Sequence, residues 1–204
     1  MKGYQISRDK FMSQEEVRVL LKVCEDQAIL DAARGRRTWP TRYMLVHLAL
    51  HSGLRVSELA ALVIGDLYLI GRENYLVVRN GKGGKKRDVY LDREIVRHLK
   101  EYIAVKKTWH NPVDEGAPLF MGRSGHFSET ALHLSFQKAV GAAGLKRRYS
   151  IHAARHTYAT ILLARTNNLR FVQKQLGHAS LNMTALYADV LPEQNQSLAN
   201  TMAD

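Results

Sequence analysis

Apolar side chains recur at helical spacing along most of this chain, and polar capping signals mark where helices begin. Ser13 and Glu16 form a capping-box pattern, and the apolar positions after them predict a helix to about residue 32. Residues 41–52 are apolar around most of the helix circumference, which predicts a buried helix that ends at Gly53. Further helices are expected at residues 55–62, 95–103, 128–144, 150–165, 169–176 and 180–189.

Three short runs in the middle of the chain have a different pattern, rich in β-branched and aromatic residues. They are separated by the turn-like sequences GREN and NGKGGKK, so we expect antiparallel strands at residues 66–70, 75–79 and 87–91. Residues 111–125 hold two prolines and three glycines and predict a loop. The predicted fold class is mainly α with a small three-stranded antiparallel β-sheet (α+β).

The periodic pattern fades at both ends of the chain and divides it into three parts. Residues 1–12 are polar and basic, and we expect an N-terminal arm or the remnant of a linker. Residues 13–190 carry all the predicted elements and form one domain, long enough to bury a core. Residues 191–204 form a polar C-terminal tail.

The charge of the chain narrows its possible partners. Thirty Lys and Arg against nineteen Asp and Glu give a net charge of +11, which favours nucleic acid or an acidic membrane surface. A basic protein without such a partner is the alternative. Cys24 is the only cysteine, which fits a reducing cytosol. No apolar run approaches the roughly 18 residues of a membrane span, so we expect a cytoplasmic protein without a membrane partner.

Arg55 follows directly after Ser52-Gly53-Leu54, where glycine permits a sharp turn into a new helix. A guanidinium at a helix start suits phosphate, because its planar fork of donors matches two phosphate oxygens. The alternative is a solvated arginine that pairs with Glu58. We expect Glu58 to orient the arginine or the helix rather than to take part in chemistry.

A basic, glycine-rich loop joins the second and third predicted strands. It contains Lys82, Lys85, Lys86 and Arg87, and its glycines would let the backbone approach another surface closely. We expect these four residues to bind DNA; a flexible, solvated hairpin tip is the alternative. The loop lacks the Gly-Lys-Ser/Thr of a nucleotide-binding P-loop.

His152 and Arg155 share one face of the helix predicted at residues 150–165, at the edge of an apolar stripe. His152 and His156 also have a spacing that can bind zinc. Ala153 stands where a metalloprotease has glutamate, however, and the cation Arg155 lies between the two histidines. We therefore expect no metal at this position.

Two further candidate site residues, His178 and Tyr187, follow Arg155 in the sequence. His178 comes after Leu176-Gly177, where glycine ends a helix, so it is either a capping histidine or a donor to a phosphate oxygen. Tyr187 lies nine residues beyond and, considered alone, is more typical of a core aromatic.

The order of these motifs resembles the catalytic signature of tyrosine recombinases, the phage integrase family. SGLR-x-x-EL, a lysine between two strands, His-x-x-Arg, Leu-Gly-His and a tyrosine follow one another between residues 55 and 187. The pair Ala153-Ala154 departs from what many members carry. The resemblance implies the catalytic-domain fold of the family and six catalytic residues: Arg55, Lys82, His152, Arg155, His178 and Tyr187.

The resemblance also implies a role for each residue. Tyr187 would attack a phosphodiester, and His152 is the candidate base, because a free phenol has a pKa of about 10. The two arginines and His178 would stabilise charge on the phosphate. Lys82 matches the general acid for the 5′-oxygen best, although the two later lysines of the same loop stay alternatives.

The implied activity is that of a site-specific DNA recombinase (integrase) that works through a 3′-phosphotyrosyl intermediate without metal, ATP or another cofactor. A type IB topoisomerase-like nicking-closing enzyme and a non-cleaving DNA-binding regulator are the alternatives. The implied partners are double-stranded DNA and further copies of the chain, as a dimer to tetramer on DNA, with residues 191–204 docking on a neighbouring subunit. Most family members carry an N-terminal core-binding domain, and Arg55 comes too early here for one to precede it.

Overall fold

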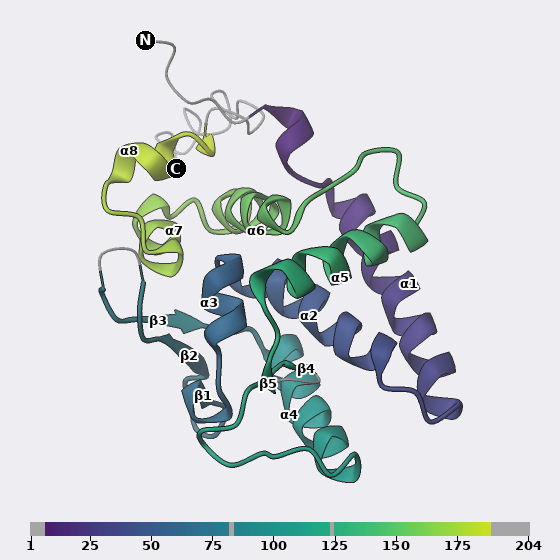
Figure 1. The fold of residues 1–204 in the computed structure, drawn as a ribbon. Helices are drawn as coiled ribbons and strands as arrows, with labels where there is room; N and C mark the ends of the chain where they lie inside the picture. The colour runs from purple at the N-terminus through teal and green to yellow at the C-terminus, as the bar shows by residue number, and fades with distance from the viewer. Residues whose placement is uncertain (1–6, 82–83, 123–124, 189–204) are drawn as a thin grey trace.

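Helix α2 (Thr38–Ser52) is the central helix of the domain, and the other long helices are arranged around it (Figure 1). The computed structural model describes residues 7–81, 84–122 and 125–188. Every side chain from Met44 to Leu50 is buried, as the apolar circumference predicted, and α2 contacts α1, α4, α5 and α6. The helix begins three residues earlier than expected, because Pro40 lies in its first turn, where no backbone donor is needed.

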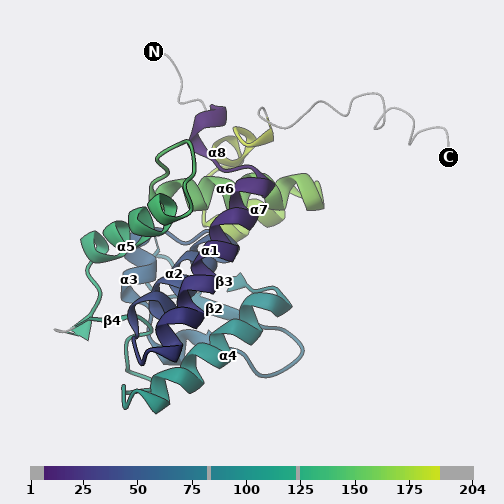
Figure 2. The same ribbon diagram turned by 90° about the vertical axis from the view of Figure 1, so that its right-hand side faces the viewer.

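Helix α1 (Gln14–Ala33) lies along α2 and begins at the predicted capping box (Figure 2). Glu16 donates its backbone N–H to Ser13 Oγ (3.1 Å), and Ser13 donates its own to Glu16 Oε2 (2.7 Å). Cys24 is fully buried on this helix, and burial raises the pKa of its thiol to about 12. The preceding residues also pack: Phe11 and Met12 are buried after the short helix η1 (Arg8–Lys10), where we expected a loose arm.

The three-stranded sheet has the order β1-β2-β3 and is antiparallel throughout, as predicted. Its strands are β1 (Leu67–Tyr68), β2 (Tyr75–Val78) and β3 (Arg87–Tyr90). Strand β1 is shorter than expected, because Asp66 belongs to the preceding helix η2 (Ile64–Asp66), where its carboxylate accepts from the backbone of Val63. A second hairpin, β4 (Met121–Gly122) and β5 (Gly125–His126), falls where we expected only a loop.

Helix α4 (Arg93–Thr108) follows the sheet and carries a buried lysine near its C-terminal end. Lys106 is fully buried, and its ammonium donates to the carbonyl oxygens of Pro118 and Leu119 (3.0 Å to Leu119). Burial lowers the pKa of this ammonium. Lys106 thus fixes Pro118 and Leu119, which precede β4, against α4. No sequence pattern predicts this contact.

The last four helices are α5 (Glu129–Ala142), α6 (Ile151–Thr166), α7 (Leu169–Leu176) and α8 (Leu181–Ala185). In Figure 1, α7 and α8 lie at one end of α6, and α7 contacts strand β3. A second apolar cluster joins α6, α7 and Tyr187, apart from the main core around α2. Helix α8 is shorter than expected. Within the described ranges, no helix is long and apolar enough to cross a membrane.

Candidate active site

Arg55 stands at the turn between α2 and α3 (Val56–Ala61), as the motif SGLR predicted. Gly53 ends α2 with φ +61°, and a Cβ there would lie 2.3 Å from the ring of Tyr158, so glycine is needed for both conformation and space. Arg55 then caps α3: its backbone N–H donates to Glu58 Oε2 and its guanidinium to Glu58 Oε1, both at 2.8 Å. Glu58 therefore orients Arg55, as expected.

Glu58 is buried between two arginines. Arg87 from β3 donates through both terminal nitrogens to the two oxygens of Glu58 (2.8 Å each) and through Nε to the carbonyl of Gln175 (3.1 Å). Burial acts to raise the pKa of Glu58, but the hydrogen bonds from Arg87 and Arg55 outweigh it and lower the pKa to about 2. The Arg87 side chain is 11% exposed and ties β3 to α3 and α7. The guanidinium of Arg87, one of the residues expected to bind DNA, thus contacts the same carboxylate as Arg55, and its side chain also lines a basic groove.

We expect Glu58→Gln to lower the free energy of unfolding by on the order of 3 kcal/mol at pH 7, because the pKa of Glu58 falls from 4.5 to about 2 on folding. Since this pKa is lowered, the stabilisation is complete above about pH 5 and is lost as the pH falls toward 2. Urea unfolding from pH 7 to pH 2 measures it. Glu15→Gln, which changes an exposed carboxylate, should cost less than about 1 kcal/mol. Equal losses in the two variants would contradict a stabilising role for the buried carboxylate.

Arg155 lies on α6 and is buried where two helix ends meet. Its two terminal nitrogens donate to the carbonyl of Gly53 at the end of α2 (2.6 Å) and to that of Leu176 at the end of α7 (2.8 Å). Both carbonyls belong to helix C-termini, which favour a cation. Burial and the neighbouring charge of Arg55 lower the pKa of Arg155 to about 10, so the guanidinium is charged at neutral pH.

His178 follows the end of α7 and is held in place from two sides. Its backbone N–H donates to the carbonyl of Gln173 (3.2 Å), and its Nδ1 lies 3.0 Å from the hydroxyl of Thr184. Gly177 has φ +65°, and a Cβ there would meet the Arg87 side chain at 2.8 Å. Burial and then Arg155 lower the pKa of His178 to about 4, so the imidazole is neutral at pH 7.

Tyr187 is 2% exposed and lies against the imidazoles of His156 and His178. Its hydroxyl is 3.0 Å from Nδ1 of His156, and its ring is parallel to that of His178 at a centroid distance of 6.2 Å. His152 lies one turn earlier on α6, with an exposed side chain. The structure thus places His156, for which the sequence pattern indicated only a zinc-binding spacing, against the tyrosine.

The neighbourhood of His156 makes it an acceptor. Burial, followed by the charges of Arg155 and Lys10, lowers the pKa of His156 to about 4, so its ring is neutral at pH 7. A neutral imidazole can accept the phenolic hydrogen at Nδ1. The sequence carries a signal for this role, since residues 152 and 156 share a helix face, a spacing that also occurs in zinc sites.

A basic groove of about 660 Å³ runs beside this cluster, between the end of α7 and strand β3. Lys85 and Lys86 line it from the hairpin, and Arg170 and Lys174 line it from α7, together with His178. Lys82 lies outside the described residues. Three of the four residues expected to bind DNA, Lys85, Lys86 and Arg87, therefore line a groove whose charge suits an anionic backbone.

The fold and this cluster together define the class of protein. Residues 10–194 match the model of the phage integrase family, and the chain belongs to that family. The fold is that of the tyrosine recombinase catalytic domain. The solved structure of XerA recombinase is 25% identical, with a TM-score of 0.72 over 95% of this chain and 65% of that one. XerH recombinase bound to its difH substrate, at 23% identity and a TM-score of 0.75 over 97% of this chain and 54% of that one, supports the fold alone.

The relatives of this chain include tyrosine recombinases named XerC. The protein from Bradyrhizobium diazoefficiens is 34% identical over 166 residues, which cover 80% of this chain and 50% of the relative. The one from Haemophilus ducreyi is 38% identical over 144 residues, which cover 70% of this chain and 45% of the relative. The chain therefore spans about half the length of the curated relatives it matches.

Proposed function

We propose that this chain is the catalytic part of a site-specific DNA recombinase that cuts and rejoins strands through a 3′-phosphotyrosyl intermediate. The observation that carries the proposal is the convergence of Tyr187 with Arg155 and His178, beside the Arg55–Glu58 pair. Arg155 and His178, which complement a phosphate, thus lie near one phenol, and Arg55 lies near Arg155. Family membership and the XerC relatives support the same activity.

In the proposed reaction the Tyr187 oxygen bonds to phosphorus while the bond to the DNA 5′-oxygen breaks. Arg55 and Arg155 would donate to the non-bridging oxygens, where negative charge builds up. His178, with Nδ1 facing Thr184, keeps Nε2 for the same purpose. Lys82, or another lysine of its loop, would give a proton to the leaving 5′-hydroxyl. Attack by a second 5′-hydroxyl on the phosphotyrosine reverses the step, so the bond energy is conserved and no ATP is needed.

The phenolic proton has two candidate acceptors. His156 contacts the Tyr187 hydroxyl at 3.0 Å and would orient the phenol, whereas His152 stays a prediction as the base that removes the proton. Tyr187 is 2% exposed, so the proposal requires the residues around α8 to shift when DNA enters. An exposed His152 is available to a substrate that arrives from solvent.

We further propose double-stranded DNA as the partner, cytoplasmic location, and self-association on DNA. The recombinase XerH was solved with its difH substrate, and the Tn1549 integrase with transposon end DNA, which supports DNA for this chain. To test the activity, the full chain is mixed with nicked duplex DNA from its own genomic neighbourhood and denatured with SDS. A protein–DNA complex that survives SDS supports the proposal, and relaxation of plasmids without any strand exchange would favour a nicking-closing enzyme instead.

We expect the affinity for DNA to fall steeply with salt, because each phosphate contact releases counterions and adds about 0.9 to the logarithmic slope. Lys85→Gln and Lys86→Gln should each reduce the slope by about 1. Lys100→Gln, an exposed lysine on α4 that does not line the groove, should leave it unchanged. Fluorescence anisotropy, recorded from about 50 to 300 mM salt, measures the slope of log affinity against log salt concentration. A flat salt response would contradict the DNA-binding groove.

A further inference from the structure

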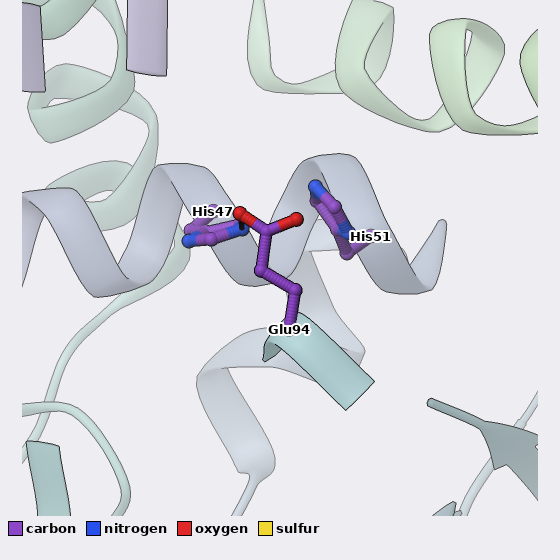
Figure 3. A group of neighbouring side chains, drawn as sticks. All are labelled: His47, His51 and Glu94. Carbon is purple, nitrogen blue, oxygen red and sulfur yellow. Dashed lines mark ion pairs between the residues drawn. The ribbon is translucent and has the colours of Figure 1, made fainter. Parts of the chain in front are cut away.

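Two histidines and a glutamate converge between helices α2 and α4 (Figure 3). His47 and His51 are one turn apart on α2, and Glu94 lies in the first turn of α4. One ligand atom from each lies within 4.8 Å of the other two, and in the part of the chain that the structure describes, this is the group with that property. None of the three belongs to the candidate active site.

His47 gives the strongest reason to look for a ligand here. Its side chain is 1% exposed, and its Nε2 is the buried side-chain nitrogen that, among the described residues, has no hydrogen-bond partner. The nearest acid oxygen, Glu94 Oε1, lies 3.8 Å away, too far for a hydrogen bond. Buried polar atoms nearly always have a hydrogen-bond partner or a ligand. The lack of one at His47 Nε2 therefore indicates a binding partner other than the atoms of the protein.

The second histidine is held as metal ligands usually are. His51 Nδ1 lies 2.7 Å from Asp92 Oδ2, and the other oxygen of Asp92 caps α4 by accepting from the backbone of Glu94 and Ile95. A carboxylate on one ring nitrogen fixes the tautomer and leaves the other nitrogen, Nε2, as the donor to a metal. Burial and the neighbouring imidazoles lower the pKa of His47 to about 3, so the His47 ring is neutral at pH 7.

An ion can reach His51 and Glu94 from solvent. A cavity of about 400 Å³ opens beside them and is lined by His51, Asp92 and Glu94, with Leu50 and Tyr158 among its apolar walls. The Glu94 side chain is 58% exposed and can move toward the two imidazoles. A tetrahedral zinc site with ligands at about 2.0 Å needs its ligand atoms about 3.4 Å apart, a small contraction for an exposed carboxylate.

We infer that His47 Nε2, His51 Nε2 and Glu94 bind a divalent transition metal, with zinc as the ion that fits best. Two imidazoles and one carboxylate are a donor set that zinc prefers, whereas calcium and magnesium need mostly oxygen ligands. Water would fill the fourth position. This inference is independent of the proposed DNA chemistry.

Protons on the neighbouring imidazoles must rearrange when zinc binds. Arg97 places a guanidinium nitrogen 2.5 Å from His98 Nε2, and a guanidinium can only donate, so His98 carries its proton on Nδ1. That proton points at His47 Nδ1, 2.7 Å away, and His47 carries its own on Nε2. On zinc binding, the Nε2 proton of His47 goes to solvent, His47 Nδ1 takes the proton of His98, and His98 Nε2 takes one from solvent. The proton count is unchanged, and the 59% exposed Arg97 side chain turns away.

The position of the site gives the metal a structural role. Zinc would join the last turn of α2 to the first turn of α4, two residues before Gly53, whose carbonyl accepts from Arg155. The ion would stabilise the turn that presents Arg55 without touching the reacting groups. Binding to the folded state alone raises stability in proportion to the logarithm of free zinc.

The test uses the full chain without an affinity tag. Zinc binding is measured by calorimetry, and cobalt is substituted for its visible absorption, which reports coordination. The matched pair is Glu94→Gln and Glu101→Gln: both carboxylates lie on α4 and both side chains are 58% exposed. His51→Ala and His133→Ala, which changes a half-buried histidine on α5, form a second pair. Thermal unfolding with chelator confirms that each variant folds.

We expect one zinc ion per chain that raises the Tm and is removed by chelator. Glu94→Gln and His51→Ala should each weaken that binding by at least about 100-fold, since even outer-shell partners of a metal are worth 10–100-fold. Glu101→Gln and His133→Ala should bind as the unaltered chain does. The inference is overturned if the unaltered chain binds no zinc, or if Glu94→Gln binds it as tightly as Glu101→Gln does.

Discussion

Replacing Tyr187 with phenylalanine is expected to abolish the covalent protein–DNA complex entirely, because the phenolic oxygen is the atom proposed to bond to phosphorus. The fold should survive. The ring keeps its place beside His178, and the loss of the 3.0 Å contact with His156 should cost only about 1 kcal/mol. SDS gels with labelled nicked DNA measure the complex, and DNA binding before denaturation should be unchanged.

Tyr158→Phe is the matched control for this substitution. Tyr158 is buried in the same apolar cluster as Tyr187 and lies on α6, so the two variants make the same chemical change in the same surroundings. Tyr158→Phe should form the covalent complex at close to the normal rate. A Tyr187→Phe protein that still formed the complex would show that another residue is the nucleophile.

Arg155→Ala is expected to lower the rate of covalent complex formation by about 10²–10³-fold, the usual loss when one charged donor to a reacting oxygen is removed. It should also lower the free energy of unfolding by about 3–5 kcal/mol, because it leaves two buried carbonyls at helix ends without their donor. Urea unfolding measures the stability. The rate is compared at a temperature where both proteins are folded.

Two further variants separate charge from geometry at this position. Arg165→Ala, an exposed arginine on the same helix, should change stability by no more than about 0.5 kcal/mol. Arg155→Lys keeps the charge but cannot reach both carbonyls with a planar fork, so it should lose stability as well as rate. If Arg155→Lys kept the full rate and stability, the two-carbonyl arrangement would have no importance for the site.

Most helices could be predicted from the sequence because their start signals are local. Ser13 and Glu16 form the capping box that begins α1, and apolar residues on every side made α2 a buried helix. The errors fall where structure depends on distant partners. Asp66 joined η2 rather than β1 because its carboxylate, which accepts from Val63 close by, also binds Arg79, 13 residues away. The segment that leads into the β4–β5 hairpin is held by Lys106 of α4, which donates to the carbonyls of Pro118 and Leu119. That contact forms only once α4 has folded.

The candidate site was predictable as a set of residues but not as a set of contacts. Motif order placed Arg55, Arg155, His178 and Tyr187 together, and the structure brings them into one cluster. The Glu58–Arg87 pair spans 29 residues, so no local pattern could reveal that Arg87 faces inward. The group of His47, His51 and Glu94 was equally hidden, because α2 and α4 meet only in the folded chain.

The single cysteine gives this chain an internal label. Cys24 is fully buried where α1 lies along α2, and the pKa of its thiol is raised to about 12. Thiolate is the reactive form, so a thiol reagent at pH 8 has no target until these two helices separate. The rate at which Cys24 is labelled therefore reports how often α1 and α2 separate. The measurement uses the unaltered protein and needs no engineered labelling site.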